Sequence, residues 1–403
     1  MKKIIALTLA ATLALGLTAC GQEAPGTPTT APTTSADPTS PTIPPELEEL
    51  YKINSYTGSA EDVIANKDTI VATLGDKQLR NSTLQLYYWL DVYDYLSSYG
   101  TNGLDLSKPL HEQKLGDFGT WQHSFLGSAL TGWQYYEALS TLAQEENTAL
   151  LPFFQKQMDH MDEELRKSAE ENDFASVEEM ILHDVGPGVS AEDFRLQRMA
   201  LYTAQSYTHN LINKMSFTDD QLEAYFTEYE ATLSVEGITK TTGNCHSVRH
   251  ILLQLDESIK EPTDQDWDDL RAKAQALLDQ WLNGEATEES FAQLAIEHSE
   301  DPGSVNSGGL YDGLDENTSF LQPFKQWYLE EGRKAGDYCL IKTTAGYHIM
   351  YYSCTEPVWV YYCRNMMISD EIKKVETAAM EKWTPVIYYD KILLGEVSLL
   401  DDK

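Results

Sequence analysis

The order of the elements predicted after residue 240 constrains the fold more than any other feature of this chain. Residues 248–253 are mostly aliphatic and predict a strand, and residues 263–283 carry apolar side chains at helical spacing up to Gly284. The full predicted order is one strand, three helices and two strands, at residues 248–253, 263–283, 290–298, about 324–329, 338–342 and 347–353. Two closing strands joined by a tight turn favour a small antiparallel sheet flanked by helices. We therefore expect an α+β fold.

The region before this unit, residues 47–240, is predicted to be mostly helical. A strand at 70–74 comes first, and capping residues then mark the starts of several helices. These caps are Asn81 or Ser82, Ser176, Ser190 and Thr218. The region is rich in tyrosine, tryptophan and methionine, which form a helix-packing core or, alternatively, an apolar surface for unfolded chains.

The N-terminal residues predict export. Two lysines precede an apolar run, residues 4–17, that is too short for a permanent transmembrane helix. The run ends in Leu17-Thr18-Ala19-Cys20, which resembles the bacterial lipobox, so we expect removal of residues 1–19 and acylation of Cys20. The alternative is an ordinary signal peptide with a chance cysteine. Residues 20–46 are rich in threonine and proline and predict a disordered tether. The expected location is the cell membrane, lipid-anchored and facing the extracytoplasmic side.

Charge and cysteine spacing exclude several classes of partner. The chain has 29 basic and 64 acidic residues and a net charge of −35, which argues against binding to nucleic acid. The cysteines after Cys20 are Cys245, Cys339, Cys354 and Cys363. Their spacing matches no metal-binding motif, so we expect no metal site.

Motifs in the C-terminal half resemble those of the parvulin family of peptidyl-prolyl isomerases. Four of them occur in the family's order, across about residues 245–354. They are Arg249-His250-Ile251-Leu252-Leu253, Phe291-Ala-Gln-Leu-Ala295 followed by His298-Ser299-Glu300-Asp301, Gly303-Ser304 with Gly308-Gly309, and Gly346-Tyr347-His348-Ile349. Any one of these motifs is weak, but the four together are a strong signal.

The resemblance implies a site that rotates X–Pro bonds without a cofactor. The reaction must overcome about 20 kcal/mol and makes no covalent bond, so an apolar pocket with adjacent polar groups suffices. By resemblance, the residues expected at the reacting bond or supporting it are Asp301, the paired histidines His250 and His348, and Thr343, which fixes the tautomer of His348. The residues expected to bind substrate are Phe320, Phe324 and either Leu310 or Tyr311.

The glycine-bearing loop departs from the family pattern. The family usually has Gly-Asp-Leu-Gly, whereas this chain has Gly309-Leu310-Tyr311-Asp312-Gly313. This departure keeps open a binding-only chaperone whose parvulin unit is a scaffold. A third hypothesis that the sequence leaves open is an adaptor for one dedicated envelope partner. The acidic connection after the first strand makes recognition of phosphorylated residues unexpected.

The whole arrangement resembles the PrsA-type foldase lipoproteins and, more distantly, SurA. The resemblance implies a helical chaperone-like region at 47–240, a parvulin domain at 241–356, and a segment at 357–403 that completes the helical lobe. In that last segment we expect a helix at 370–382 and a strand at 386–394. The predicted function is extracytoplasmic isomerisation of X–Pro bonds in unfolded or newly exported polypeptides, together with holding them.

The sheet order of a parvulin domain also predicts a pair of neighbouring cysteines. If His250 and His348 meet across adjacent antiparallel strands, Cys245 and Cys354 face each other to within one residue. A disulfide could bridge that separation in an exported protein. Two free thiols remain the alternative.

Overall fold

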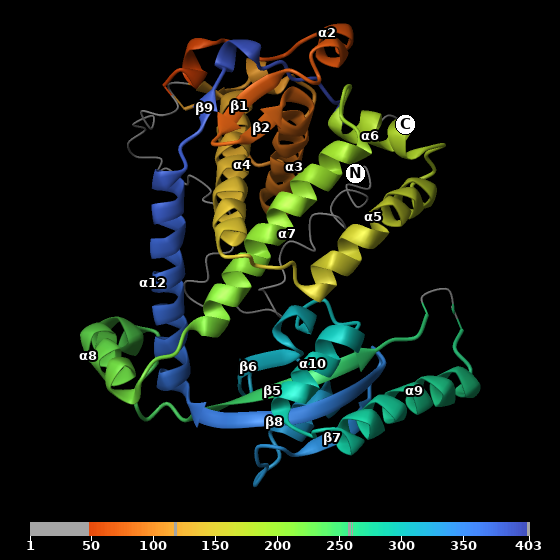
Figure 1. Ribbon diagram of the computed structural model, residues 1–403, viewed down its shortest axis with the longest axis vertical. Coiled ribbons are helices and arrows are strands. Elements are labelled where there is room, and N and C mark those ends of the chain that lie inside the picture. The colour runs from red at the N-terminus through yellow and green to blue at the C-terminus, as the bar shows by residue number, and fades with distance from the viewer. Residues whose placement is uncertain (1–47, 117–118, 257–258, 260, 401–403) are drawn as a thin grey trace.

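The computed structural model describes residues 48–116, 119–256, 259 and 261–400, which form two lobes connected along one side by a long helix (Figure 1). The upper lobe contains α2 (Ala60–Ala65), β1 (Ile70–Leu74), β2 (Lys77–Arg80), α3 (Asn81–Tyr99), β3 (Lys114–Leu115), β4 (Gly119–Thr120), α4 (Trp121–Glu145), α5 (Pro152–Glu171), α6 (Val177–Val185), α7 (Ala191–Lys214) and β9 (Val386–Ile387). The lower lobe contains β5 (Asn244–Leu253), α9 (Asp264–Asn283), α10 (Glu288–His298), β6 (Leu310–Leu314), α11 (Gln322–Tyr328), β7 (Tyr338–Lys342) and β8 (Tyr347–Pro357). The connecting helix is α12 (Val358–Lys382), and α8 (Asp219–Val235) lies beside it. The predicted α+β class is confirmed.

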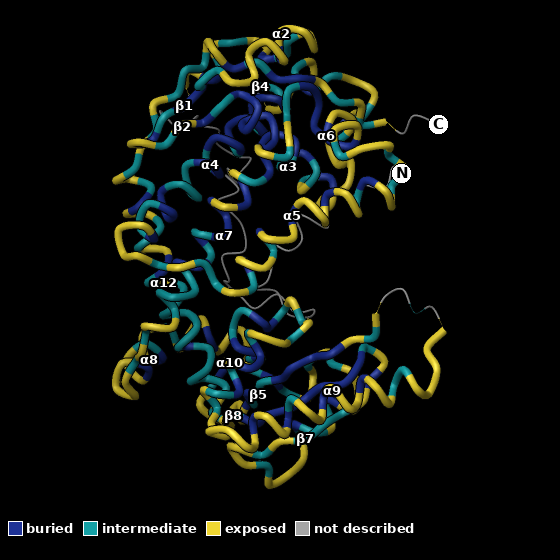
Figure 2. Tube along the Cα trace, turned by 45° about the vertical axis from the view of Figure 1, so that its right-hand side comes forward, coloured by how far each residue is buried: buried dark blue, intermediate teal, exposed yellow. Residues whose placement is uncertain are grey.

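The core of the upper lobe lies between α3, α4 and α7, which pack against one another. Figure 2 shows this buried interior in dark blue under an exposed outer layer. The predicted N-caps Ser176, Ser190 and Thr218 are confirmed, and each precedes its helix by one residue. The predicted cap of α3 is wrong, because the helix begins at Asn81 after Arg80. The Asn81 side chain is used instead to bond the distant C-terminal segment.

The C-terminal segment differs from its predicted elements. Helix α12 begins directly after Pro357, so the predicted start at 370 is wrong by twelve residues. Its first turns are aromatic and β-branched, a composition typical of strands, but they pack on α8 around buried Cys363. Of the predicted strand 386–394, the residues Val386 and Ile387 pair with β1, and Leu394 forms an isolated bridge.

The lower lobe is built on a four-stranded antiparallel sheet in the order β6-β5-β8-β7. Helices α9 and α10 cover one face, whereas α11 lies with the side chains of the other face. The predicted order omitted strand β6, because Gly308, Gly309 and Gly313 made that stretch look like a loop. Residues Leu310–Leu314 form the strand and pair with β5.

The pairing of β5 with β8 corrects the predicted register. The two strands are adjacent and antiparallel as expected, but Cys245 lies opposite Glu356 and Cys354 lies opposite Ser247. The cysteines are therefore two positions out of register, and both are free thiols. The prediction failed because the two histidines meet diagonally and not directly opposite each other, and because β8 has an extra residue, Ser353, between the partners of Ser247 and Val248.

Within the described ranges, no helix is long and apolar enough to cross a bilayer. The signal sequence, Cys20 and the tether fall before residue 48 and so lie outside the described residues.

Candidate active site

Four predicted residues form one continuous chain of polar contacts on the sheet face opposite α9 and α10. Asp301 Oδ2 lies 2.7 Å from His250 Nε2, and His250 Nδ1 lies 3.1 Å from His348 Nδ1. His348 Nε2 then lies 2.8 Å from Thr343 Oγ1. The histidines and Thr343 are buried, whereas Asp301 keeps part of its surface exposed. The carboxylate is therefore the member of this chain that can touch another molecule.

Neighbouring strands and loops position each of these side chains. His250 lies on β5 opposite Met350, and His348 lies on β8 opposite Leu252, so the two rings are diagonal neighbours on one face. The loop that carries Asp301 is tied to β5 by the bond from Glu300 N to Leu252 O. Thr343 lies in the turn between β7 and β8.

The electrostatics of the site favour an ionised carboxylate beside neutral His348. Burial would raise the pKa of Asp301, but hydrogen bonds from His250, Ser304 and Tyr311 and the charge of His250 hold that pKa well below its usual range. Burial, reinforced by the neighbouring His250 and partly offset by the charge of Asp301, lowers the pKa of His348 to about 4. Near neutral pH, Asp301 is therefore ionised and the His348 ring is uncharged.

The ionised carboxylate fixes the direction of the first contact in this chain. It only accepts, so His250 Nε2 donates to Asp301. The contacts of His250 Nδ1 with His348 Nδ1, and of His348 Nε2 with the Thr343 hydroxyl, complete the chain. Because all four ring nitrogens have partners inside the protein, the histidines fix Asp301 and leave no nitrogen for proton exchange with a substrate.

An aromatic cluster lies directly beside this polar chain. The rings of Phe320 and Phe324 stack with centroids 4.5 Å apart, and Tyr311 meets Phe320 edge-on at 4.9 Å. Phe324 is buried and also contacts the rings of His250 and His348 edge-on. The partly exposed rings of Tyr311 and Phe320 form the outer surface of the cluster.

The position of strand β6 distinguishes the two candidates left open by the sequence. Tyr311 pairs with Val248 and joins the aromatic cluster, and its hydroxyl donates to Asp301 Oδ2 at 3.0 Å. Leu310 pairs with Arg249 and so points to the opposite face of the sheet, the one covered by α10. The structure thus brings Tyr311 to the site and places Leu310 outside it.

Sequence reasoning missed one member of the site, Ser304. Its hydroxyl donates to Asp301 Oδ2 and lies 3.0 Å from His250 Nε2, and the side chain is buried. The spacing of three residues between Asp301 and Ser304 is one at which a serine hydroxyl bonds locally, and this spacing was the available signal.

The arrangement suits recognition of an apolar ring next to a peptide group. The aromatic surface can bind such a ring by burial of apolar area. The ionised Asp301, already fixed by three donors, can act on a neighbouring amide without reorganising. No cluster of three or more potential metal ligands occurs among the residues that the structure describes.

Comparison with known proteins identifies the domain that carries this site. Residues 233–353 match the family described as the PPIC-type PPIase domain. The chain finds no match among curated proteins.

Solved structures of foldases give weaker likenesses. PrsA from Bacillus subtilis is 17% identical, with 66% of this chain and 88% of that chain covered and a TM-score of 0.30. A SurA-like chaperone from Campylobacter jejuni is 16% identical, with 78% and 96% covered and a TM-score of 0.20. PrsA from Lactococcus lactis is 11% identical, with 79% and 94% covered and a TM-score of 0.22.

Proposed function

Because residues 233–353 form a parvulin-type domain of the PPIC-type PPIase family, we propose that this chain isomerises X–Pro bonds in exported, unfolded polypeptides and holds those polypeptides. The observation that carries the proposal is the ionised Asp301, which lies against the aromatic cluster of Tyr311, Phe320 and Phe324. The proline ring would bind on the aromatic surface, and Asp301 would face the rotating peptide bond. His250, His348 and Thr343 would position that carboxylate.

The proposed division of labour assigns isomerisation to residues 241–356 and holding to the helical lobe. That lobe would comprise 47–240 and be completed by 357–403, in agreement with the pairing of β9 with β1 and the packing of α12 on α4 and α7. Acylation of Cys20 and the tether at 20–46 would keep the protein at the outer side of the cell membrane.

A protease-coupled or exchange assay on short unphosphorylated X–Pro peptides tests the isomerase. Asp301→Ala and Phe324→Ala should lower the rate without unfolding the domain, as judged by circular dichroism. A wild-type protein with no rate enhancement for any residue before proline would instead support the binding-only chaperone.

An aggregation assay tests the holding role separately. The Asp301→Ala variant should still suppress aggregation of an unfolded model protein, because holding needs surface and isomerisation needs the carboxylate. Equal loss of both activities in a folded variant would contradict the division of labour.

A further inference from the structure

The upper lobe binds the main chain of its own C-terminal segment through side chains of α3. Helix α3 carries Asn81, Gln85 and Trp89 four residues apart on one buried face. Asn81 bonds both main-chain groups of Leu393, with its Nδ2 donating to the carbonyl at 2.6 Å and its Oδ1 accepting from the amide at 2.9 Å. Gln85 Oε1 accepts from Gly395 N at 2.8 Å, and Trp89 Nε1 donates to Gly395 O at 3.2 Å. This surface therefore binds a polypeptide backbone independently of its side chains.

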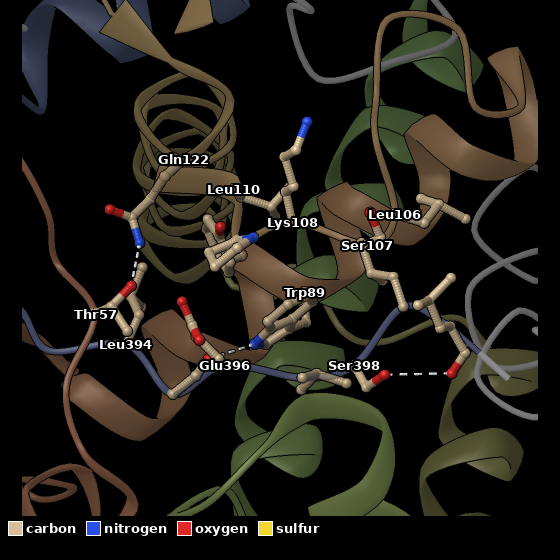
Figure 3. A pocket seen from close by; sticks show the side chains of 16 residues that line it. Thr57, Trp89, Leu106, Ser107, Lys108, Leu110, Gln122, Leu394, Glu396 and Ser398 are labelled. Atoms are coloured by element: carbon tan, nitrogen blue, oxygen red, sulfur yellow. Dashed lines mark hydrogen bonds between the residues drawn. The ribbon is translucent and has the colours of Figure 1, made fainter. Parts of the chain in front are cut away.

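A cavity of about 300 Å³ lies next to this surface, beyond Gly395 (Figure 3). Trp89, Leu106 and Leu110 supply apolar wall on one side, and residues 395–400 of the C-terminal segment line the other. Leu106 and Leu399 remain partly exposed. The cavity thus has room and apolar surface for an added side chain.

The segment that lines this cavity leaves its own backbone unpaired. Within the described part of the chain, the main-chain groups of residues 396–399 make no hydrogen bond. The preceding residues Leu393, Leu394 and Gly395 are bonded by α3 and by the chain near Tyr56. An unpaired stretch of backbone beside an apolar cavity is the surface to which an extended peptide adds, with main-chain bonds for affinity and a pocket for a side chain.

We propose that this cavity is a second polypeptide-binding site, which takes an extended segment of an unfolded chain and buries one apolar side chain against Leu106 and Leu399. This inference rests on the proposed holding function and gives it a location. The two charged side chains that line the cavity already have partners, since Lys108 lies 2.8 Å from Asp105 and Glu396 lies 3.1 Å from His111. The site therefore selects for extended, apolar chain and not for a charged ligand.

A site in the upper lobe, apart from Asp301 in the lower lobe, allows one unfolded chain to bind at two places. The second contact of such a chain is intramolecular and so forms at high effective concentration. A client held in the upper lobe would return its prolines repeatedly to the aromatic cluster.

The test uses the full mature chain and a fluorescein-labelled peptide of alternating leucine and threonine. This probe contains no proline, so it does not report on the isomerase site. Leu106→Asp and Leu399→Asp should weaken its binding roughly 10-fold or more, because each places a charge where an apolar side chain is buried. The matched control is Leu182→Asp, an exposed leucine on α6 that does not line the cavity, and it should bind as wild type does.

Two further measurements test the predicted backbone pairing. Bound peptide should slow hydrogen exchange at the amides of residues 396–399, and a peptide N-methylated at alternate positions should lose binding. If Leu106→Asp lowers the unfolding temperature, Leu399→Ser carries the test in its place. No binding by wild type, equal binding by all variants, or unprotected amides at 396–399 would each overturn the proposal.

These outcomes are separable from those of the proposed function. Suppression of aggregation with unchanged peptide binding in the Leu106 and Leu399 variants would remove the site and leave the holding function standing. If the peptide binds and protects the amides of residues 396–399 in a protein without isomerase or holding activity, the site would stand and the proposed function would fall.

Discussion

Gly309→Ala tests whether the close approach of β6 to β5 maintains the site. The backbone of Gly309 has φ +74, and an added Cβ would lie 2.2 Å from His250 O, more than 1 Å inside ordinary contact. The left-handed conformation costs alanine roughly 1–2 kcal/mol. The clash also forces apart the bond from His250 N to Gly309 O, now 2.8 Å, and an unsatisfied buried amide costs about 1–3 kcal/mol. We expect the variant to lose roughly 2–5 kcal/mol of unfolding free energy.

Gly332→Ala is the matched control for this substitution. Gly332 also has positive φ, +85, but an added Cβ would meet nothing within 4 Å. Its free energy of unfolding should therefore fall only by the conformational cost, roughly 1–2 kcal/mol. Urea denaturation of both variants measures the two losses. Equal losses in the two variants would refute the argument that the contact with His250 matters. Isomerase activity measured on the folded fraction should fall for Gly309→Ala alone, because His250 positions Asp301.

Three further predictions concern hydrogen bonds and protonation. Tyr311→Phe keeps the ring but removes a donor to Asp301, so isomerase kcat/KM should fall about 3- to 10-fold with an unchanged circular dichroism spectrum, and an unchanged rate would show that this bond is dispensable. Asp193→Ala leaves two buried α3 hydroxyls without their acceptor, so the free energy of unfolding should fall by about 3 kcal/mol in chemical denaturation. A fall below about 1 kcal/mol would contradict this role of Asp193. The pKa of His348 is lowered from 6.5 to about 4, so below pH 6.5 the unfolded chain binds a proton that the folded ring does not. Between pH 7 and pH 5, the free energy of unfolding of wild type should therefore fall by about 2 kcal/mol more than that of His348→Gln, as measured by urea denaturation. Equal losses in the two proteins would contradict the lowered pKa of His348.

Features that depend on local sequence could be predicted well. Ser176, Ser190 and Thr218 each cap a helix because a serine or threonine side chain satisfies amides only a few residues away. The strands that carry His250 and His348 were likewise marked by their own residues. These signals need no knowledge of distant partners, and for that reason they could be read from the chain alone.

Features that depend on distant partners could not be predicted in the same way. Asn81 is of a residue type that commonly caps helices, yet its side chain bonds Leu393, more than three hundred residues later. The first turns of α12 have strand-like side chains, and their packing on α8 decides the conformation. The register of β5 and β8 depends on the extra residue Ser353 of β8, which the order of polar and apolar residues in that strand does not indicate.

The strand that the sequence did not predict is also where the connecting helix α12 touches the sheet next to the site. Strand β6 carries Tyr311 at the edge of the sheet, and two residues later Gly313 lies under the ring of Tyr361 on α12. An added Cβ at Gly313 would lie 2.3 Å from Tyr361 Cζ, so the helix rests directly on the backbone of this strand. An edge strand held on one side only by β5 would be free to shift, and the Tyr311 hydroxyl would shift with it. The ring of Tyr361 therefore supports the strand whose Tyr311 bonds Asp301, and the helix that carries Tyr361 packs against α4 and α7 of the upper lobe.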